Sequence, residues 1–291
     1  MPKASIHKLD DEEIVVIIRD AYPELVNVIR RSAIRNVPTL AIDNVYIRDL
    51  DAGMPDERIA LRLGLVPIKG PVEKYEKLLE EKPRMSIPGN ILKETIVERR
   101  GGKPDVDDIF TYLFGKPRGK TKIPAYIVRT SDMKIFAPDV EPLYDMPLFI
   151  ILAHEDTACD VRFEITIGRG KEHAKRSPVT VAASSYMPKI EIKDPSRCES
   201  CTTKACVEAC PYGALTYEDG KVKLDREKCD LCELCMRACD NIRVYGDENE
   251  IVLRIESDGR LDPKYIFCRA IDEAIKELDK LEEIVKRSLE A

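Results

Sequence analysis

The sequence predicts an α+β protein with more than one domain, and three observations support this fold class. Short strand patterns rich in β-branched residues alternate with amphipathic helical patterns in the first 70 residues. A cysteine-rich segment between Cys198 and Cys239 holds eight of the ten cysteines, and a long helical pattern follows it. The 291 residues are enough for about two domains, and 44% of them are hydrophobic, which suffices for ordinary cores.

Charge and composition argue against some classes of function. The chain has 47 basic and 53 acidic residues, so it is mildly acidic, which argues against a dedicated nucleic-acid clamp. No positively charged leader precedes an apolar stretch and a cleavage site. The longest apolar run, residues 146–153, contains Pro147 and is too short to span a bilayer. We therefore expect a cytoplasmic protein that does not contact a membrane.

The first elements follow from local patterns. Residues 13–19 read as a buried strand, because β-branched residues are flanked by charge. Pro23 is placed to open a helix, and apolar residues follow at helical spacing until Pro38 ends it. Residues 39–47 read as the next strand. Pro55 and Gly64 are placed to start and stop a second, short helix.

The middle of the chain is less regular. Residues 71–124 contain many prolines and a basic stretch at 116–122, and we expect an insertion there. The basic stretch is typical of a solvated surface loop, with contact to nucleic acid or to an acidic partner as the alternative. Strand patterns then return at residues 125–129, 148–152 and 162–167.

A basic loop between two glycines, residues 168–176, follows the last of these strands. Gly168 and Gly170 suggest a phosphate-binding turn, but the third glycine and the following helix of such a motif are missing. His7, His154 and His173 have no partner at the spacing of metal ligands or of a catalytic triad, so we expect structural or surface roles. Cys159 and Cys268 are expected to be small buried hydrophobic residues.

The cysteine-rich segment has the spacing of iron–sulfur ligands. It reads C-x2-C-x4-C-x3-C, then eighteen residues that begin with Pro211, then C-x2-C-x2-C-x3-C-D. In two-cluster ferredoxins the fourth cysteine of each run ligates the other cluster. We therefore assign one [4Fe–4S] cluster to a first cysteine set, Cys198, Cys201, Cys206 and Cys239. A second cysteine set, Cys229, Cys232, Cys235 and Cys210, receives the other cluster.

Alternatives to two [4Fe–4S] clusters remain open at this point. Structural zinc also takes four thiolates, although zinc ribbons usually carry separate two-cysteine knuckles. Fewer clusters, or [3Fe–4S] clusters, would use the same residues. An internal repeat relates the two cysteine runs and predicts a ferredoxin-like βαββαβ domain, in which Asp240 stands where ferredoxins have proline.

The end of the chain predicts a strand at residues 251–255 and a long helix that opens at Pro263. Its apolar residues step by four and three, which is the seam that packs against another helix. The seam residues are Phe267, Ile271, Ala274, Leu278, Leu281 and Val285. We expect this helix, with the one from Pro23, to form an interface with a partner subunit, and packing within its own domain is the alternative.

Four blocks in the sequence closely resemble the D-type subunit family of archaeal RNA polymerases, which is related to the bacterial α subunit. They are residues 27–43 (NVIRRSAIRNVPTLAID), 55–67 (PDERIALRLGLVP), 168–175 (GRGKEHAK) and 256–259 (ESDG) with the closing helix. The blocks occur in the family's order and span nearly the whole chain, so they are more specific than the cysteines, whose fold is grafted onto many proteins.

The resemblance implies an α-subunit-like architecture. A discontinuous dimerisation domain takes residues 1–43 and 250–291, an inserted α+β domain takes 44–187, and the ferredoxin-like domain takes 188–249. The implied partners are subunit L, the large catalytic subunits, which the loop at 168–175 would face, and the small subunits N and P.

The leading interpretation is a non-catalytic assembly subunit of DNA-directed RNA polymerase. No closely spaced aspartate triad is present to hold catalytic magnesium. The clusters would be structural, with oxygen sensing as a further hypothesis, and DNA would be reached only through the complex. The rival interpretation is a ferredoxin-type electron-transfer subunit of an oxidoreductase, although the chain has no flavin or nicotinamide fingerprint. Direct DNA contact through the basic loops is a third.

Overall fold

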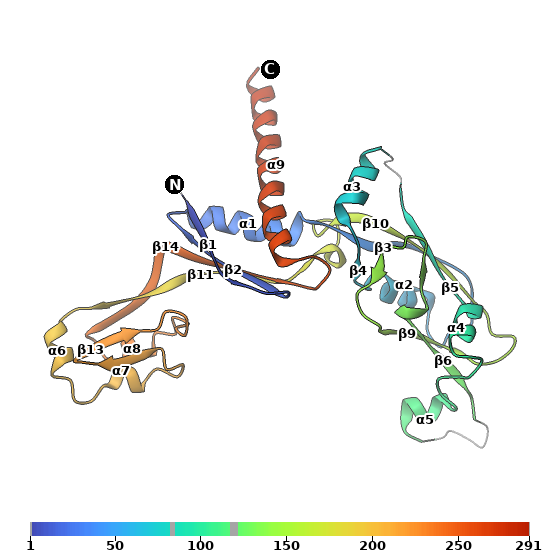
Figure 1. Ribbon diagram of the computed structural model, residues 1–291, viewed down its shortest axis with the longest axis horizontal. Coiled ribbons are helices and arrows are strands. Elements are labelled where there is room, and N and C mark those ends of the chain that lie inside the picture. The colour runs from blue at the N-terminus through green and yellow to red at the C-terminus, as the bar shows by residue number, and fades with distance from the viewer. Residues whose placement is uncertain (1, 82–84, 117–121, 291) are drawn as a thin grey trace. The chain divides into compact units, whose positions relative to one another are not determined.

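The computed structural model describes residues 2–81, 85–116 and 122–290, and it divides the chain into two compact units. Unit 1 consists of residues 1–32, 181–256 and 270–291, and unit 2 consists of residues 33–180 and 257–269. Strands and helices are mixed along the whole chain (Figure 1), so the predicted α+β class is confirmed.

Unit 1 is built on a four-stranded sheet. Its strand order is β1 (Lys3–Leu9), β2 (Glu13–Arg19), β14 (Ile242–Ser257) and β11 (Val179–Ile192). In the centre of the sheet, β2 pairs antiparallel with β14, which places Val16 opposite Leu253 and Ile14 opposite Ile255. All four side chains are buried. The strands predicted at 13–19 and 251–255 are thereby confirmed. In β2 the β-branched residues form a continuous run from Ile14 to Ile18, which suits a strand that is buried on both faces.

Two helices of unit 1 extend across its boundaries: the last residues of one and the first residues of the other belong to unit 2. Helix α1 (Pro23–Arg35) starts at the predicted proline, and helix α9 (Pro263–Glu290) starts immediately after Asp262. Proline suits the first helical position because the missing amide hydrogen has no helical partner there. Val26 and Ala33 of α1 and Ala270 of α9 are completely buried.

The cysteine-rich segment lies between β11 and β14. Its elements, in chain order, are α6 (Pro195–Glu199), α7 (Ala205–Glu208), β12 (Leu215–Glu218), β13 (Lys221–Leu224) and α8 (Leu234–Ala238). Strands β12 and β13 form an antiparallel hairpin. The buried aliphatic residues of this segment are few, namely Leu215, Val222, Ile242 and Val244, and three cysteines complete the core.

Unit 2 contains a second four-stranded sheet and two short strand pairs. The sheet order is β3 (Pro38–Leu50), β10 (Cys159–Arg169), β5 (Ile87–Leu92) and β7 (Lys134–Ile135). The pairs are β4 (Ile68–Lys69) with β8 (Glu141–Pro142), and β6 (Ala125–Arg129) with β9 (Pro147–Leu152). The predicted strands at 39–47, 125–129, 148–152 and 162–167 all lie within these elements.

The helices of unit 2 include the predicted short one. Helix α2 (Asp56–Gly64) buries Ile59 and Leu63 completely, one turn apart, as the spacing predicts. The others are α3 (Val72–Glu81), α4 (Lys93–Arg99) and α5 (Ile109–Phe114), with single turns η1 (Thr130–Asp132) and η2 (Ala174–Arg176). The core lies between these helices and the sheet and includes the buried Phe163.

Residues 71–124 differ from the irregular insertion that the sequence suggested. Strand β5 pairs with β10 from Leu92 opposite Asp160 to Ile87 opposite Ile165, so this region supplies an inner strand of the sheet. The strand is hard to recognise because Pro88 and Gly89 interrupt it. Gly89 is needed because a Cβ there would come 2.4 Å from the ring of Phe163. Of the basic stretch at 116–122, residues 117–121 lie outside the described part.

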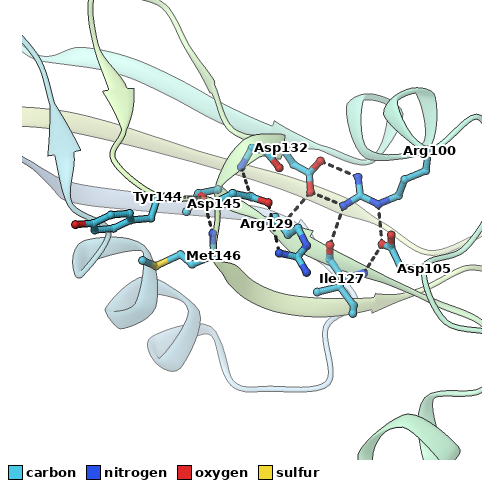
Figure 2. A network of polar contacts seen from close by, with 10 residues as sticks. Arg100, Asp105, Ile127, Arg129, Asp132, Tyr144, Asp145 and Met146 are labelled. Atoms are coloured by element: carbon cyan, nitrogen blue, oxygen red, sulfur yellow. Dashed lines mark hydrogen bonds and ion pairs between the residues drawn. The ribbon is translucent and has the colours of Figure 1, made fainter.

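Figure 2 shows a polar network that ties the end of α4 to β6 and η1. The guanidinium of Arg100 donates to both carboxylate oxygens of Asp132, at 2.7 and 2.9 Å, and to the carbonyl of Ile127 at 2.9 Å. Asp105 accepts from the same guanidinium at 2.7 Å and from the Ile127 amide at 2.8 Å. The Asp132 side chain is only 1% exposed, so its charge depends on Arg100 for compensation.

A second network holds the basic loop at 168–176 in unit 2. Arg260 is buried and donates to the Lys175 carbonyl at 3.0 Å, to the Ser177 carbonyl, and to Asp258 at 2.6 Å. The Lys175 ammonium donates to the carbonyl of Ile42 at 2.8 Å. Three sequence blocks that are far apart in the chain thus meet around two cations.

Arg176 and Gly170 fix the rest of the loop. The buried Arg176 lies 3.0 Å from Asp43 and donates to the Thr166 hydroxyl at 2.8 Å. A Cβ at Gly170 would come 2.1 Å from the carbonyl oxygen of Ile34. The glycine is therefore required by this close approach of two backbones.

We predict that Arg100→Leu lowers the free energy of unfolding by about 3 kcal/mol or more, because it leaves Asp132 buried without a counterion. Chemical denaturation measures this change. Arg129→Leu is the matched control: Arg129 pairs with the exposed Asp145 at 3.4 Å, and exposed pairs contribute at most about 1 kcal/mol. Equal losses in the two variants would contradict the role given to Arg100.

We predict that Gly170→Ala destabilises unit 2 by about 1–3 kcal/mol, since the added methyl group overlaps the Ile34 carbonyl and the backbone must shift. Gly53→Ala is the control, because no heavy atom lies within 4 Å of its added Cβ. Thermal unfolding should separate the two variants clearly. An unchanged melting temperature in Gly170→Ala would show that the loop accommodates a side chain.

Candidate cofactor and interaction sites

The structure gathers the eight predicted cysteines into two pockets of unit 1. The first cysteine set, Cys198, Cys201, Cys206 and Cys239, lines one pocket of about 430 Å³. The second cysteine set, Cys210, Cys229, Cys232 and Cys235, lines another pocket with about 10 Å³ of free space. Each pocket combines three cysteines of one run with the fourth cysteine of the other run, which is the grouping assigned from the sequence.

The two runs present their cysteines through the same local geometry. Lys204 and Glu233 precede α7 and α8, and both adopt left-handed backbone conformations, with φ of 46° and 64°. Non-glycine residues seldom adopt this conformation. Two residues later, Cys206 and Cys235 occupy the second position of their helices and are buried. The internal repeat in the sequence is therefore a repeat in conformation.

Within each set, burial and neighbouring cysteines raise the pKa of a buried thiol. Burial, followed by the neighbouring Cys239, raises the pKa of Cys206. Burial also raises the pKa of Cys235, and Cys229 and Cys210 add to that effect. Crowded thiols of this kind favour ionisation only when a cation neutralises them, and metal binding provides that charge.

Hydrogen bonds orient three sulfur atoms. The amide nitrogen of the Asn241 side chain donates to the sulfur of Cys198 at 3.2 Å, and the Ala214 backbone amide donates to the sulfur of Cys210 at 3.3 Å. At Cys201, hydrogen bonding from the Lys204 backbone amide and then from the Thr203 hydroxyl lowers the pKa. These contacts stabilise thiolates, which are the form that ligates metals.

The donor chemistry of the two pockets suits iron–sulfur clusters. Within residues 2–81, 85–116 and 122–290, no three His, Cys, Asp or Glu side chains form a group that could hold a metal ion directly. Each pocket is nevertheless lined by four cysteines, and neither lining, within the described residues, contains a histidine, although Asp240 lines the first pocket and Asp230 and Glu233 line the second. Four thiolates are the ligands of a [4Fe–4S] cubane. Binding of the clusters themselves stays a prediction.

Helix α9 carries the largest exposed apolar surface at this end of the chain. In its first half, Ile266, Ala270 and Ala274 are buried. The predicted seam is offset there, since Phe267 and Ile271 are only half-buried and Ile266 and Ala270 take the inner positions. In its second half the apolar residues are exposed by 47–82%, namely Ile275, Leu278, Leu281, Ile284, Val285 and Leu289.

Helix α1 adds exposed apolar residues in the same unit. Leu25 and Val28 are each 42% exposed, and Tyr22, just before the helix, is 81% exposed. Contiguous exposed apolar residues in a folded protein usually mark an interaction surface. Both helices from which the sequence predicted an interface therefore present such residues.

The other residues singled out in the sequence have mostly structural roles. His173 caps η2 by accepting the Lys175 amide at 3.1 Å, and His7 lies 3.5 Å from Glu227. Cys159 is buried, as predicted, and burial raises its pKa to about 12. The prediction for Cys268 was wrong. This residue is exposed, because it faces away from the side of α9 on which Ile266 and Ala270 pack.

The cations of the loop at 168–176 are engaged within unit 2. Arg169 lies 3.3 Å from Glu76, and Lys175 and Arg176 both contact Asp43. The loop therefore offers less positive charge to a nucleic acid than its sequence suggests. In the described part of the chain, no helix is long and apolar enough to cross a membrane.

Comparison with known proteins agrees with these features. Residues 15–278 match the family model of the RNA polymerase Rpb3/Rpb11 dimerisation domain. The DNA-directed RNA polymerase subunit Rpo3 of Methanobrevibacter smithii is 32% identical over 286 residues, covering 93% of both chains. Those of Methanothermobacter thermautotrophicus and Aeropyrum pernix are 33% and 32% identical, covering 90% and 98% of this chain and 90% and 93% of theirs.

The matched region covers most of the chain and includes the central strands β2 and β14, the whole of α1 and the first half of α9. The resemblance drawn from the sequence blocks is thereby confirmed. The chain belongs to the family of the RNA polymerase Rpb3/Rpb11 dimerisation domain.

Proposed function

We propose that this protein is a non-catalytic assembly subunit of DNA-directed RNA polymerase. It would form a heterodimer with the small subunit L, and the dimer would be the platform on which the large catalytic subunits assemble. The observation that carries the proposal is the exposed apolar face of α9, at the end of a chain that matches a dimerisation family. The same match makes the rival electron-transfer interpretation unnecessary.

The second half of α9 has contacts that stabilise the helix before a partner binds. Two intrahelical ion pairs support it, Glu282 with Lys286 at 2.6 Å and Glu283 with Arg287 at 3.6 Å. Both pairs place the acid four residues before the base, which is the favourable orientation in a helix. The helix can therefore persist while its apolar face is uncovered, and covering that face supplies the free energy of association.

Further contacts of the proposed complex follow from the family. The small subunits N and P would dock on the dimer, and DNA would be reached only through the assembled polymerase. The loop at 168–176 would face a large subunit as a rigid surface, because its cations and Gly170 are fixed by contacts within unit 2. The protein would act in the cytoplasm.

We also propose three domains: 1–43 with 250–291 for dimerisation, 44–187 as the inserted α+β domain, and 188–249 as a ferredoxin-like domain. The third domain would bind two [4Fe–4S] clusters, one on each cysteine set. Two observations support this: the hairpin of β12 and β13 stands between two short cysteine-bearing helices, and the two sets line separate pockets.

The proposed role of the clusters is to stabilise this third domain. Its core has four buried aliphatic side chains and three buried cysteines, which is little for a segment of this size. When a segment cannot build a sufficient core, the free energy of metal binding becomes free energy of folding. When bound, each cluster would also supply a one-electron redox centre. Oxygen sensing through the clusters remains a hypothesis.

We predict that Leu278→Glu with Leu281→Glu abolishes the one-to-one complex with subunit L, because two charges would be buried in an apolar interface. Anaerobic co-expression followed by size-exclusion chromatography measures complex formation. Lys280→Glu is the control, since this exposed residue lies on the face of α9 opposite Leu278 and belongs to neither of the two ion pairs. A stable complex in the double variant would refute the proposed interface.

We predict about eight iron atoms per chain after anaerobic purification, as two cubanes require. Cys201→Ser should lower this number to about four and leave the visible absorption of one cluster. Cys268→Ser is the control, because this exposed cysteine belongs to neither set. One bound zinc per pocket and no sulfide would instead favour structural zinc sites.

A further inference from the structure

The two cysteine pockets differ in the charge of their surroundings. The first pocket is lined by Arg197, Lys204 and Arg237 against one acid, Asp240, so three positive charges and one negative charge leave a surplus of two positive charges. The second pocket is lined by Asp230 and Glu233, and its lining, which lies wholly in the described residues, contains no lysine or arginine. Two similar ligand sets thus have opposite electrostatic environments.

Half of this contrast is found at one pair of positions that correspond in the internal repeat, Lys204 and Glu233. Lys204 and Glu233 have the same left-handed backbone conformation and stand two residues before Cys206 and Cys235. The Lys204 ammonium lies 4.8 Å from the centre of the Tyr217 ring, which holds it beside the first pocket. The repeat therefore places a cation beside one set and an anion beside the other.

Side-chain hydrogen bonding differs in the same direction, while backbone amides donate to sulfurs of both sets. The first set receives side-chain contacts at two sulfurs, from Asn241 at 3.2 Å and from the Thr203 hydroxyl at 3.8 Å. At the second set the donors are backbone amides, from Ala214 to Cys210, from Leu231 to Cys229 and from Met236 to Cys235. Donors that point at sulfur stabilise added negative charge on a cluster.

We infer that the two proposed clusters have different reduction potentials and that Lys204 and Glu233 set much of the difference. This inference rests on the proposed clusters. When bound, each [4Fe–4S] core would accept one electron from an external reductant, and the cluster with its four thiolates would become more negative by one charge. Nearby cations and hydrogen-bond donors stabilise the reduced state, and nearby carboxylates destabilise it. The cluster on the first cysteine set is reduced first.

Reciprocal charge reversal at the equivalent positions tests this inference. The complete chain, co-purified anaerobically with subunit L, is titrated with dithionite in the presence of redox mediators, and reduced clusters are followed by electron paramagnetic resonance. Cys201→Ser and Cys232→Ser, each of which removes one ligand from one set, assign the two signals. The unmodified protein should show two midpoint potentials, the higher one belonging to the first set.

Lys204→Glu should lower the ratio of reduced to oxidised first cluster about tenfold at a fixed potential, which is a shift of about 59 mV for one electron. Glu233→Lys should raise the corresponding ratio for the second cluster by a similar factor. Lys204→Arg keeps the charge and should leave the reduction potential of the first cluster unchanged. A merely structural role for the lysine side chain would not predict this result. Lys3→Glu, a substitution on β1 that lines neither pocket, is the control and should move neither potential.

The possible failures are distinct. Protein without iron and sulfide would overturn the proposed clusters themselves. Two bound clusters with equal potentials, or with potentials that do not respond to Lys204→Glu and Glu233→Lys, would overturn only the inference about charge. A higher potential at the second set would also overturn it, and would show that solvent exposure, greatest at Cys232, outweighs the charges.

Discussion

The arrangement of unit 2 depends on buried guanidinium groups that bind backbone carbonyls and carboxylates. Arg260 joins the turn after β14 to the carbonyls of Lys175 and Ser177, and Arg176 joins the same loop to Asp43 at β3. A buried cation is stable only when acceptors surround it, so these contacts hold each strand end in one position. The loop that would face a large polymerase subunit is thereby fixed before any partner binds, which limits the entropy lost on assembly.

Unit 1 shows the opposite condition, since two of its parts lack enough internal contacts. From Ile275 onward, α9 leaves six large apolar side chains exposed, and the cysteine-rich segment buries only four large aliphatic ones besides Ala214. A partner helix would complete the first part, and clusters would complete the second. Both additions would stabilise the folded state by binding to it, so on this proposal the stability of unit 1 would depend on subunit L and on iron supply.

The charge difference between the cysteine pockets has a simple structural origin. An internal repeat places Lys204 and Glu233 in equivalent positions, although the first run has two more residues between its second and third cysteines. Lys204 and Glu233 share one backbone conformation but carry opposite charges. Such a pair changes the local potential without changing ligand geometry, so two similar sites can differ in chemistry at little structural cost.

The sequence by itself determined the α+β class, most strands and helices, and the family, because local periodicity and ordered motifs carry this information. It did not reveal β5, whose Pro88 and Gly89 hide a strand that only its pairing with β10 defines. The sequence also did not predict which residues of α9 are buried, or that Cys268 is exposed. Only the tertiary structure decided these features, together with the partners of Arg100, Arg176 and Arg260, because they depend on contacts between residues far apart in the chain.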